Sequence, residues 1–164
     1  MGYNYTDSIE SGYNFGDEIN NSDFKNALNS LAVISYRYID FDKTKYHFFQ
    51  DCFDNKDILE YFDFMNFLTS YPFNDILSNK DKDWHLYNNN YFKDLRFKEL
   101  VDTALGIKKG LRVEQVPSFY HFALYTNENA SRHTNIKSPR VYFFIGENAI
   151  IYPLFYDPYH EINP

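Results

Sequence analysis

The sequence has little of what cross-links a chain or holds it in a bilayer. Cys52 is the only cysteine among 164 residues, so neither a disulfide framework nor a cysteine zinc site forms within one chain. No stretch approaches the ~20 apolar residues of a membrane span, and the N-terminus lacks the basic and apolar regions of a signal peptide. We therefore expect a soluble, cytoplasmic protein that makes no contact with a membrane.

Several catalytic signatures are absent as well. The sequence contains no GxxxxGK[ST] phosphate loop, no GxGxxG, no HExxH and no GxSxG. Their absence argues against nucleotide hydrolysis, Rossmann redox chemistry, zincin proteolysis and serine hydrolysis. No compact His-x3-His element indicates a metal site, and Cys52 has no activating neighbours. We therefore expect neither a metal nor another cofactor.

Aromatic residues and negative charge are abundant. Phe, Tyr and Trp make up 21% of the chain, which suits half-buried strands and interfaces. The residue usage is also typical of an AT-rich genome. The net charge is −7, with 18 acidic and 10 basic residues through Gly106 and 5 acidic and 6 basic residues after it. Phosphate contacts supply most of the affinity for nucleic acids, so only the C-terminal third offers a surface for them.

The chain divides into an arm and one domain. Residues 1–22 are polar and contain glycine, which predicts a flexible N-terminal arm, and residues 23–164 form a single α+β domain. Apolar residues at helical spacing predict helices that begin at Ser22, Asp57, Pro72 and Phe97. The apolar stripe of the second helix is interpreted as core packing; its members are Ile58, Tyr61, Phe62, Met65 and Leu68. Gly106 ends the last helix.

Alternating patterns predict the strands, at about 32–41, 118–126, 140–145 and 149–156. A run of asparagines, Asn88 to Asn90, predicts a loop over 79–90. Pro153 cannot donate a hydrogen bond to a ladder, so the last strand lies at an edge or has a bulge there, and an exposed edge would allow a homodimer. We expect an α+β fold with an antiparallel sheet of about four strands and helices packed on one face.

The last two predicted strands bring ionisable residues together. A hairpin that turns at Gly146 returns Asp157, Tyr159 and His160 to the end of the sheet where Arg140 lies. Arg holds a phosphate with two hydrogen bonds, and His or Tyr moves protons near neutral pH. The alternative is that Asp157-Pro158 only turns the chain.

Other candidates for substrate binding lie outside that hairpin. His121 stands in an aromatic strand, where packing is the competing interpretation, and His133 stands in a polar loop. Lys108, Lys109 and Arg112 form the densest basic cluster, although they also suit the negative end of the preceding helix. Together with His121 and His133, this cluster makes up the predicted substrate-binding set.

One stretch resembles a known family. Ser131-Arg132, the strand Ser138-Pro-Arg140-Val141-Tyr142, the next strand and the tail with His160 are similar to the C-terminal half of RelE-type mRNA interferase toxins. That family cleaves mRNA without a metal, usually on the ribosome, and is paired with an antitoxin protein. The resemblance covers about the last 35 residues. It implies that the catalytic residues are Arg132, Arg140, Tyr159 and His160.

The rest of the chain departs from that family, because it is acidic and has a long helix-containing N-terminal half. The whole layout is similar to small proteins of bacterial mobile elements, from which no activity carries over. Two hypotheses therefore stand side by side. The first is a nucleic-acid-directed protein, a metal-independent endoribonuclease of a toxin or defence system, acting on RNA or the ribosome. The second is a non-enzymatic binding protein whose acidic, aromatic surface captures a protein partner or mimics nucleic-acid charge.

Overall fold

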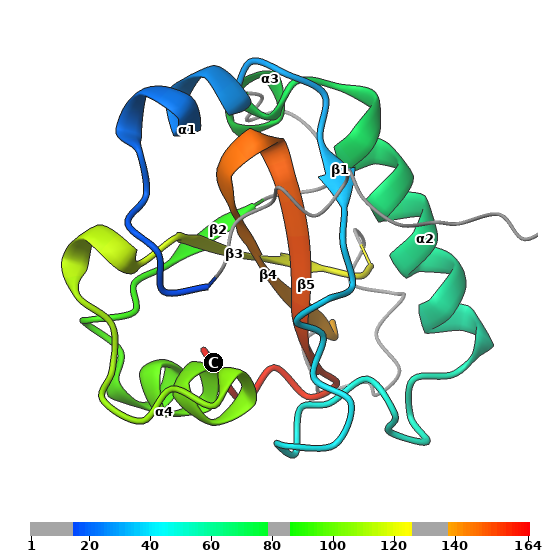
Figure 1. Ribbon diagram of the computed structural model, residues 1–164. Coiled ribbons are helices and arrows are strands. Elements are labelled where there is room, and N and C mark those ends of the chain that lie inside the picture. Colours follow the sequence, from blue (N-terminus) through cyan, green and yellow to red (C-terminus); the bar gives the residue numbers. More distant parts are fainter. Residues whose placement is uncertain (1–14, 79–85, 126–137) are drawn as a thin grey trace, which may run out of the picture.

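A computed structural model describes residues 15–78, 86–125 and 138–164. Its centre is a five-stranded sheet in the order β1-β5-β4-β3-β2 (Figure 1). The strands are β1 (Val33–Ile34), β2 (Tyr87–Asn89), β3 (Ser118–Ala123), β4 (Arg140–Ile145) and β5 (Ile150–Asp157). β2 to β5 pair antiparallel with their neighbours, whereas β1 runs parallel to β5. The α+β class is as predicted, but the sheet is mixed and has one strand more than expected.

Four α-helices accompany the sheet, and short side chains cap most of them. They are α1 (Asn21–Ala27), α2 (Asn55–Ser70), α3 (Phe73–Ser78) and α4 (Leu95–Leu105). Asn20 caps α1, Asp54 caps α2 and Asp94 caps α4, each by accepting a backbone N–H of the first turn. α4 ends at Gly106, whose left-handed φ of 68° closes the helix.

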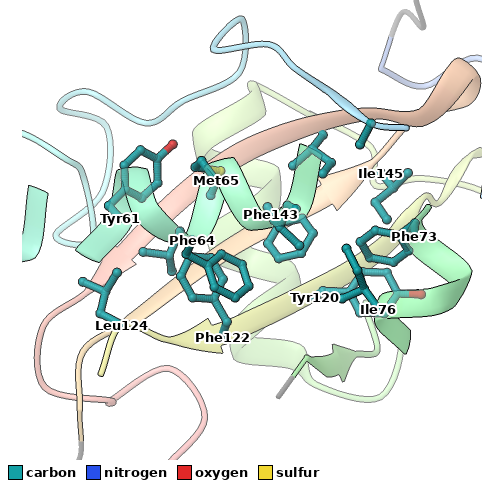
Figure 2. Packing of buried hydrophobic residues seen from close by; sticks show 14 of the residues in the cluster. Tyr61, Phe64, Met65, Phe73, Ile76, Tyr120, Phe122, Leu124, Phe143 and Ile145 are labelled. Carbon is teal, nitrogen blue, oxygen red and sulfur yellow. The ribbon is translucent and has the colours of Figure 1, made fainter. Parts of the chain in front are cut away.

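The helices lie on both faces of the sheet, so the prediction that they pack on one face is wrong. α2 and α3 cover the face that presents Tyr120, Phe122 and Phe143 (Figure 2). α4 covers the opposite face, against Phe119 and Phe144. The physical reason is the alternation of side chains along β3 and β4, which makes both faces apolar. A sheet with two apolar faces needs a cover on each.

α2 is the longest helix, and its apolar stripe forms much of the first core. Phe64 stacks on Phe122 with ring centroids 3.5 Å apart, and Tyr61 and Met65 are buried beside it (Figure 2). Leu68 of the same helix is also buried. Phe62 departs from the predicted core stripe, because its side chain is 56% exposed. The helix ends before Pro72, in agreement with the restriction that proline places on the preceding residue.

The two outer strands were predicted poorly. The strand expected at 32–41 is only two residues long, because the chain turns away into a loop that Asp40 organises by accepting N–H groups of Lys43 and Thr44. The loop expected over 79–90 contains β2, whose pairing with β3 places Asn89 opposite Phe119. Neighbouring backbone, rather than local propensity, makes this asparagine-rich segment a strand.

Pro153 lies at a bulge in the ladder between β4 and β5 and not on a free edge. Phe143 pairs with Pro153, and the register shifts between Tyr142 and Phe143. The other side of β5 is covered, since β1 pairs with its start and backbone N–H groups of Ser35 and Asp40 donate to its carbonyls. The predicted homodimer needs an exposed edge of β5, and the described part of β5 has no such edge.

The described part of the predicted arm packs on the domain. Phe15 contacts the rings of Tyr38 and Phe144, and Ile19 donates its N–H to the carbonyl of Glu114. Residues 15–22 are therefore not a free arm, while residues 1–14 lie outside the described residues. No helix in the described ranges is both long and apolar enough to cross a membrane.

Candidate functional site

A polar cluster lies at the end of the sheet where β4 begins and β5 ends. Arg140 is the first residue of β4 and pairs with Asp157, the last residue of β5. On its other side Arg140 pairs with Ala123 of β3. The β4–β5 hairpin therefore delivers the C-terminal tail to the strand that carries Arg140. We call His121, Arg140, Tyr142 and His160 the sheet-end cluster.

His121 stands at the centre of this cluster, on the face of the sheet that α4 covers. Its side chain is 4% exposed. Its ring lies between Tyr87 and Tyr142, with ring centroids 5.1 Å and 4.8 Å away. Nδ1 of His121 lies 2.6 Å from Oδ1 of Asn89. Because an amide oxygen only accepts hydrogen bonds, Nδ1 carries the proton and Nε2 keeps its lone pair.

The surroundings of His121 keep its imidazole neutral. Burial lowers the pKa of His121 to about 3, and the charges of Arg140 and His160 act in the same direction. The two imidazoles are neighbours, with ring centroids of His121 and His160 6.2 Å apart. A neutral imidazole with one fixed tautomer presents its Nε2 lone pair at pH 7, but so low a pKa makes it a weak base. An anion bound against Arg140 would offset one of the charges that lower this pKa and so strengthen His121 as a general base.

Arg140 contributes a buried cation. Its Nε and Nη1 atoms are buried and meet no hydrogen-bond acceptor within the described residues. Burial lowers the pKa of Arg140, while Tyr87, Tyr142 and Asp157 oppose that shift. An arginine remains charged in proteins even so. A buried cation with unsatisfied donors is costly, and an anion placed against it would satisfy them.

The Tyr142 hydroxyl is a second unsatisfied group in the cluster. The side chain is fully buried, and its hydroxyl has no hydrogen-bond partner among the residues described. Burial raises the pKa of Tyr142, so the phenol stays protonated. The sheet-end cluster thus presents donors from both Arg140 and Tyr142 that no protein atom in the described ranges accepts.

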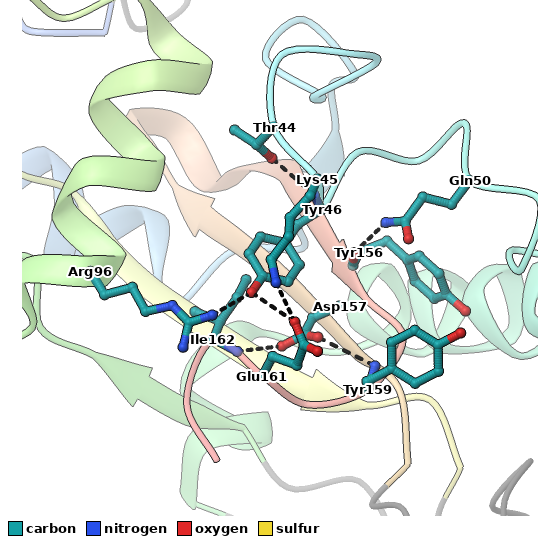
Figure 3. Close-up of polar contacts among 10 residues, drawn as sticks. All are labelled: Thr44, Lys45, Tyr46, Gln50, Arg96, Tyr156, Asp157, Tyr159, Glu161 and Ile162. Carbon is teal, nitrogen blue, oxygen red and sulfur yellow. Dashed lines mark hydrogen bonds and ion pairs between the residues drawn. The ribbon is translucent and has the colours of Figure 1, made fainter.

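The tail is folded back by Asp157 so that His160 reaches the cluster. The Asp157 carboxylate accepts N–H groups from Ile162, at 2.7 Å, and from Tyr159, at 3.3 Å (Figure 3). Burial raises the pKa of Asp157, and those backbone N–H groups oppose the shift. His160 itself has a φ of 54°, a left-handed conformation in which His is tolerated better than most residues. Asp157 therefore positions the tail.

Beyond His160 the tail is held by a network from two other segments. Lys45 forms an ion pair with Glu161 at 2.5 Å, and the Tyr46 hydroxyl donates to Glu161 at 3.2 Å. Arg96 of α4 donates to the Tyr46 hydroxyl at 2.6 Å (Figure 3). This network fixes the tail to the loop after β1 and to the start of α4.

The other predicted site residues are distributed elsewhere. Tyr159 is beside the cluster in sequence, but its side chain is largely exposed. Arg112 is ion-paired with Glu18 and Glu114, at 3.0 Å and 2.9 Å, so two carboxylates already neutralise it. Lys108 and Lys109 are exposed in the bend after α4. Arg132 and His133 lie outside the described residues.

Sequence reasoning missed three contributors to the cluster. Asn89, which sets the tautomer of His121, lies in the run Asn88 to Asn90, whose composition predicts a loop. Tyr87 and Tyr142 look like ordinary strand aromatics. The only available signal was the alternation in β4, which places Tyr142 on the same face as Arg140. The pairing of β2 with β3 has no signature in the sequence.

No protein-family model, curated protein or solved structure matches the chain. What the cluster does must therefore be inferred from its own side chains.

Proposed function

We propose that the chain is a nucleic-acid-directed protein, an endoribonuclease that cleaves RNA without a metal at the sheet-end cluster. The observation that carries this proposal is the half-buried guanidinium of Arg140, whose buried Nε and Nη1 atoms meet no acceptor in the described part of the chain and whose charge acts on His121 together with that of His160. A phosphodiester supplies the anionic oxygens that such donors bind.

The chemistry needs a base, an acid and a cation. Nε2 of His121 takes the proton of the ribose 2′-hydroxyl, and the 2′-oxygen forms a bond to phosphorus. His160 gives a proton to the 5′-oxygen as the bond between that oxygen and phosphorus breaks. Arg140 stabilises the charge that develops on the non-bridging oxygens. The products are a 2′,3′-cyclic phosphate and a 5′-hydroxyl, so DNA of the same sequence is not cleaved.

The cellular setting of the proposal is a toxin or defence system. The resemblance to RelE-type toxins supports it, since Arg140 and His160 occupy corresponding places in the last strands and the tail. In that setting the substrate is RNA, free or on the ribosome, and an antitoxin protein restrains the activity. Arg132, which lies outside the described residues, and Tyr159 stay in the proposed catalytic set that the resemblance implies.

Expression in bacteria tests this setting. Cells that produce the wild-type chain should stop growing and lose intact RNA, while cells that produce His160→Asn should do neither. Asparagine tolerates the left-handed backbone of position 160, so the change removes the imidazole with little strain. Leu59→Ala, an exposed residue on α2, is the matched control and should behave as wild type. Intact RNA in cells that produce folded wild-type protein would contradict the proposed ribonuclease activity.

A further inference from the structure

A second feature lies on the other face of the sheet, between α2 and the segment that follows β1. Here the surface has an open cavity of about 440 Å³, lined mainly by aromatic and aliphatic side chains of residues 36–53 and of α2. Phe49, Phe62 and Tyr36 form part of its wall and are 43% to 70% exposed. Phe41, also exposed, stacks on Phe49 with ring centroids 5.0 Å apart. Exposed aromatics gathered around one cavity are typical of an interaction site.

The mainly apolar wall of the cavity contains a buried hydroxyl. The Tyr61 side chain is 3% exposed and lines the cavity, and its hydroxyl makes no hydrogen bond of good geometry within the described residues. Burial raises the pKa of Tyr61, and the neighbouring hydroxyl of Tyr36 raises it further. A ligand group with a polar tip would satisfy this hydroxyl, whereas a purely aliphatic one would not.

The charges of the two segments that line the cavity favour a cationic occupant. Seven carboxylates and four cations lie between Tyr36 and Asp63 in the sequence. Each of the four cations is engaged: Arg37 over the Tyr38 ring, Lys43 with the carbonyl of Ala104, Lys45 with Glu161 and Lys56 over the Tyr125 ring. In contrast, Asp42, Asp51 and Asp63 are exposed and form no ion pair within the described ranges.

These three carboxylates are close to the cavity along the chain. Asp51 and Asp63 each follow a residue of the wall, Gln50 and Phe62, and Asp42 follows the stacked Phe41. We propose that this surface binds a basic segment of a partner protein, which inserts a large aromatic side chain with a polar tip into the cavity. The surface lies on the α2 face, whereas the sheet-end cluster lies on the α4 face, so the inference is independent of the proposed nuclease.

Fluorescence anisotropy with defined peptides tests this surface. The probe is a labelled amphipathic peptide of Lys and Leu with one Trp, and its comparisons are the Trp→Ala peptide and a peptide with Glu in place of Lys. The full chain should bind the probe at least tenfold more tightly than either comparison peptide. Phe62→Ala should weaken binding at least tenfold, and Asp42→Asn with Asp51→Asn should weaken it a few-fold.

Leu59→Ala is the matched control, since Leu59 is exposed on the same helix but is not part of the cavity wall. This variant should bind the probe as the wild type does. The proposal is overturned if Phe62→Ala and Leu59→Ala have equal effects, or if the acidic peptide binds as well as the basic one. It is also overturned if the wild type self-associates in sedimentation and Phe62→Ala prevents it, because the occupant is then a second copy of the chain.

Discussion

At the scale of single residues, this protein buries polar groups next to aromatic rings. Asp57 is fully buried at the start of α2, and the hydroxyls of Tyr125 and Tyr156 both donate to its carboxylate. These hydrogen bonds join α2 to β5 and to the segment just after β3. Because they are made to a buried carboxylate, each is worth more than an ordinary neutral hydrogen bond.

We predict that Tyr125→Phe destabilises the fold by about 1.5–3 kcal/mol, because one hydrogen bond to a charged group is lost. Urea unfolding followed by circular dichroism measures the change. Tyr71→Phe is the control, since Tyr71 is largely exposed and water can replace what its hydroxyl contacts. It should shift the stability by less than about 0.5 kcal/mol. Equal effects of the two changes would show that the hydrogen bond from Tyr125 to Asp57 does not contribute measurably to the free energy of unfolding.

The His121 imidazole should make stability fall with pH below neutrality. Its pKa is about 3 in the folded state and 6.5 in the unfolded chain, so the unfolded state binds more protons between these values. The stabilising contribution is complete above pH 6.5 and is lost as the pH falls toward 3, at up to about 1.4 kcal/mol per pH unit. The raised pKa of Asp157 opposes this trend in acid.

NMR of the histidine ring protons checks this prediction directly. The His121 signals should keep the shifts of a neutral ring down to pH 4, and unfolding at a series of pH values should show a smaller acid loss in His121→Phe than in the wild type. A His121 signal that titrates near pH 6.5 would contradict the burial described here.

At the scale of elements, local sequence determined the helices and the central hairpin. α2 and α4 could be predicted because their caps and apolar stripes are encoded within each helix. β4 could be predicted to the residue, since its run of β-branched and aromatic residues lies between Pro139 and Gly146. β1 lies within the strand predicted at 32–41, but its short length could not be predicted. β2 could not be predicted at all. Each is short and is a strand only through its neighbour, β5 for β1 and β3 for β2.

The end of α4 tests whether the residue at position 106 alone determines where the helix stops. Gly106 has a φ of 68°, and a Cβ built there would meet no atom within 4 Å. The cost of Gly106→Ala therefore comes from the left-handed backbone alone, at about 1–2 kcal/mol. Gly106→Asn should cost less, since asparagine tolerates this conformation. Thermal unfolding of both variants measures the difference, and equal losses would refute a backbone origin.

At the scale of the whole molecule, the sheet separates two surfaces with different chemistry. The α4 face ends in the sheet-end cluster, which joins residues from β3, β4 and the tail and is supported by Tyr87 and Asn89 of β2. The α2 face carries the aromatic cavity with its acidic surroundings. The sequence predicted that Arg140 and His160 would meet at one sheet end, because a single hairpin connects them. It did not predict the part played by Asn89, because that needs the pairing of β2 with β3.

The proposed cleavage of RNA at the sheet-end cluster can be measured with a labelled RNA oligonucleotide and purified protein in excess EDTA. We predict products that end in a 2′,3′-cyclic phosphate, no cleavage of the same oligonucleotide carrying 2′-deoxyribose, and a loss of at least 100-fold in rate for His160→Asn and for His121→Phe. Leu59→Ala should keep the wild-type rate. RNA that stays intact with folded wild-type protein, or equal rates for the wild type and His160→Asn, would contradict the account.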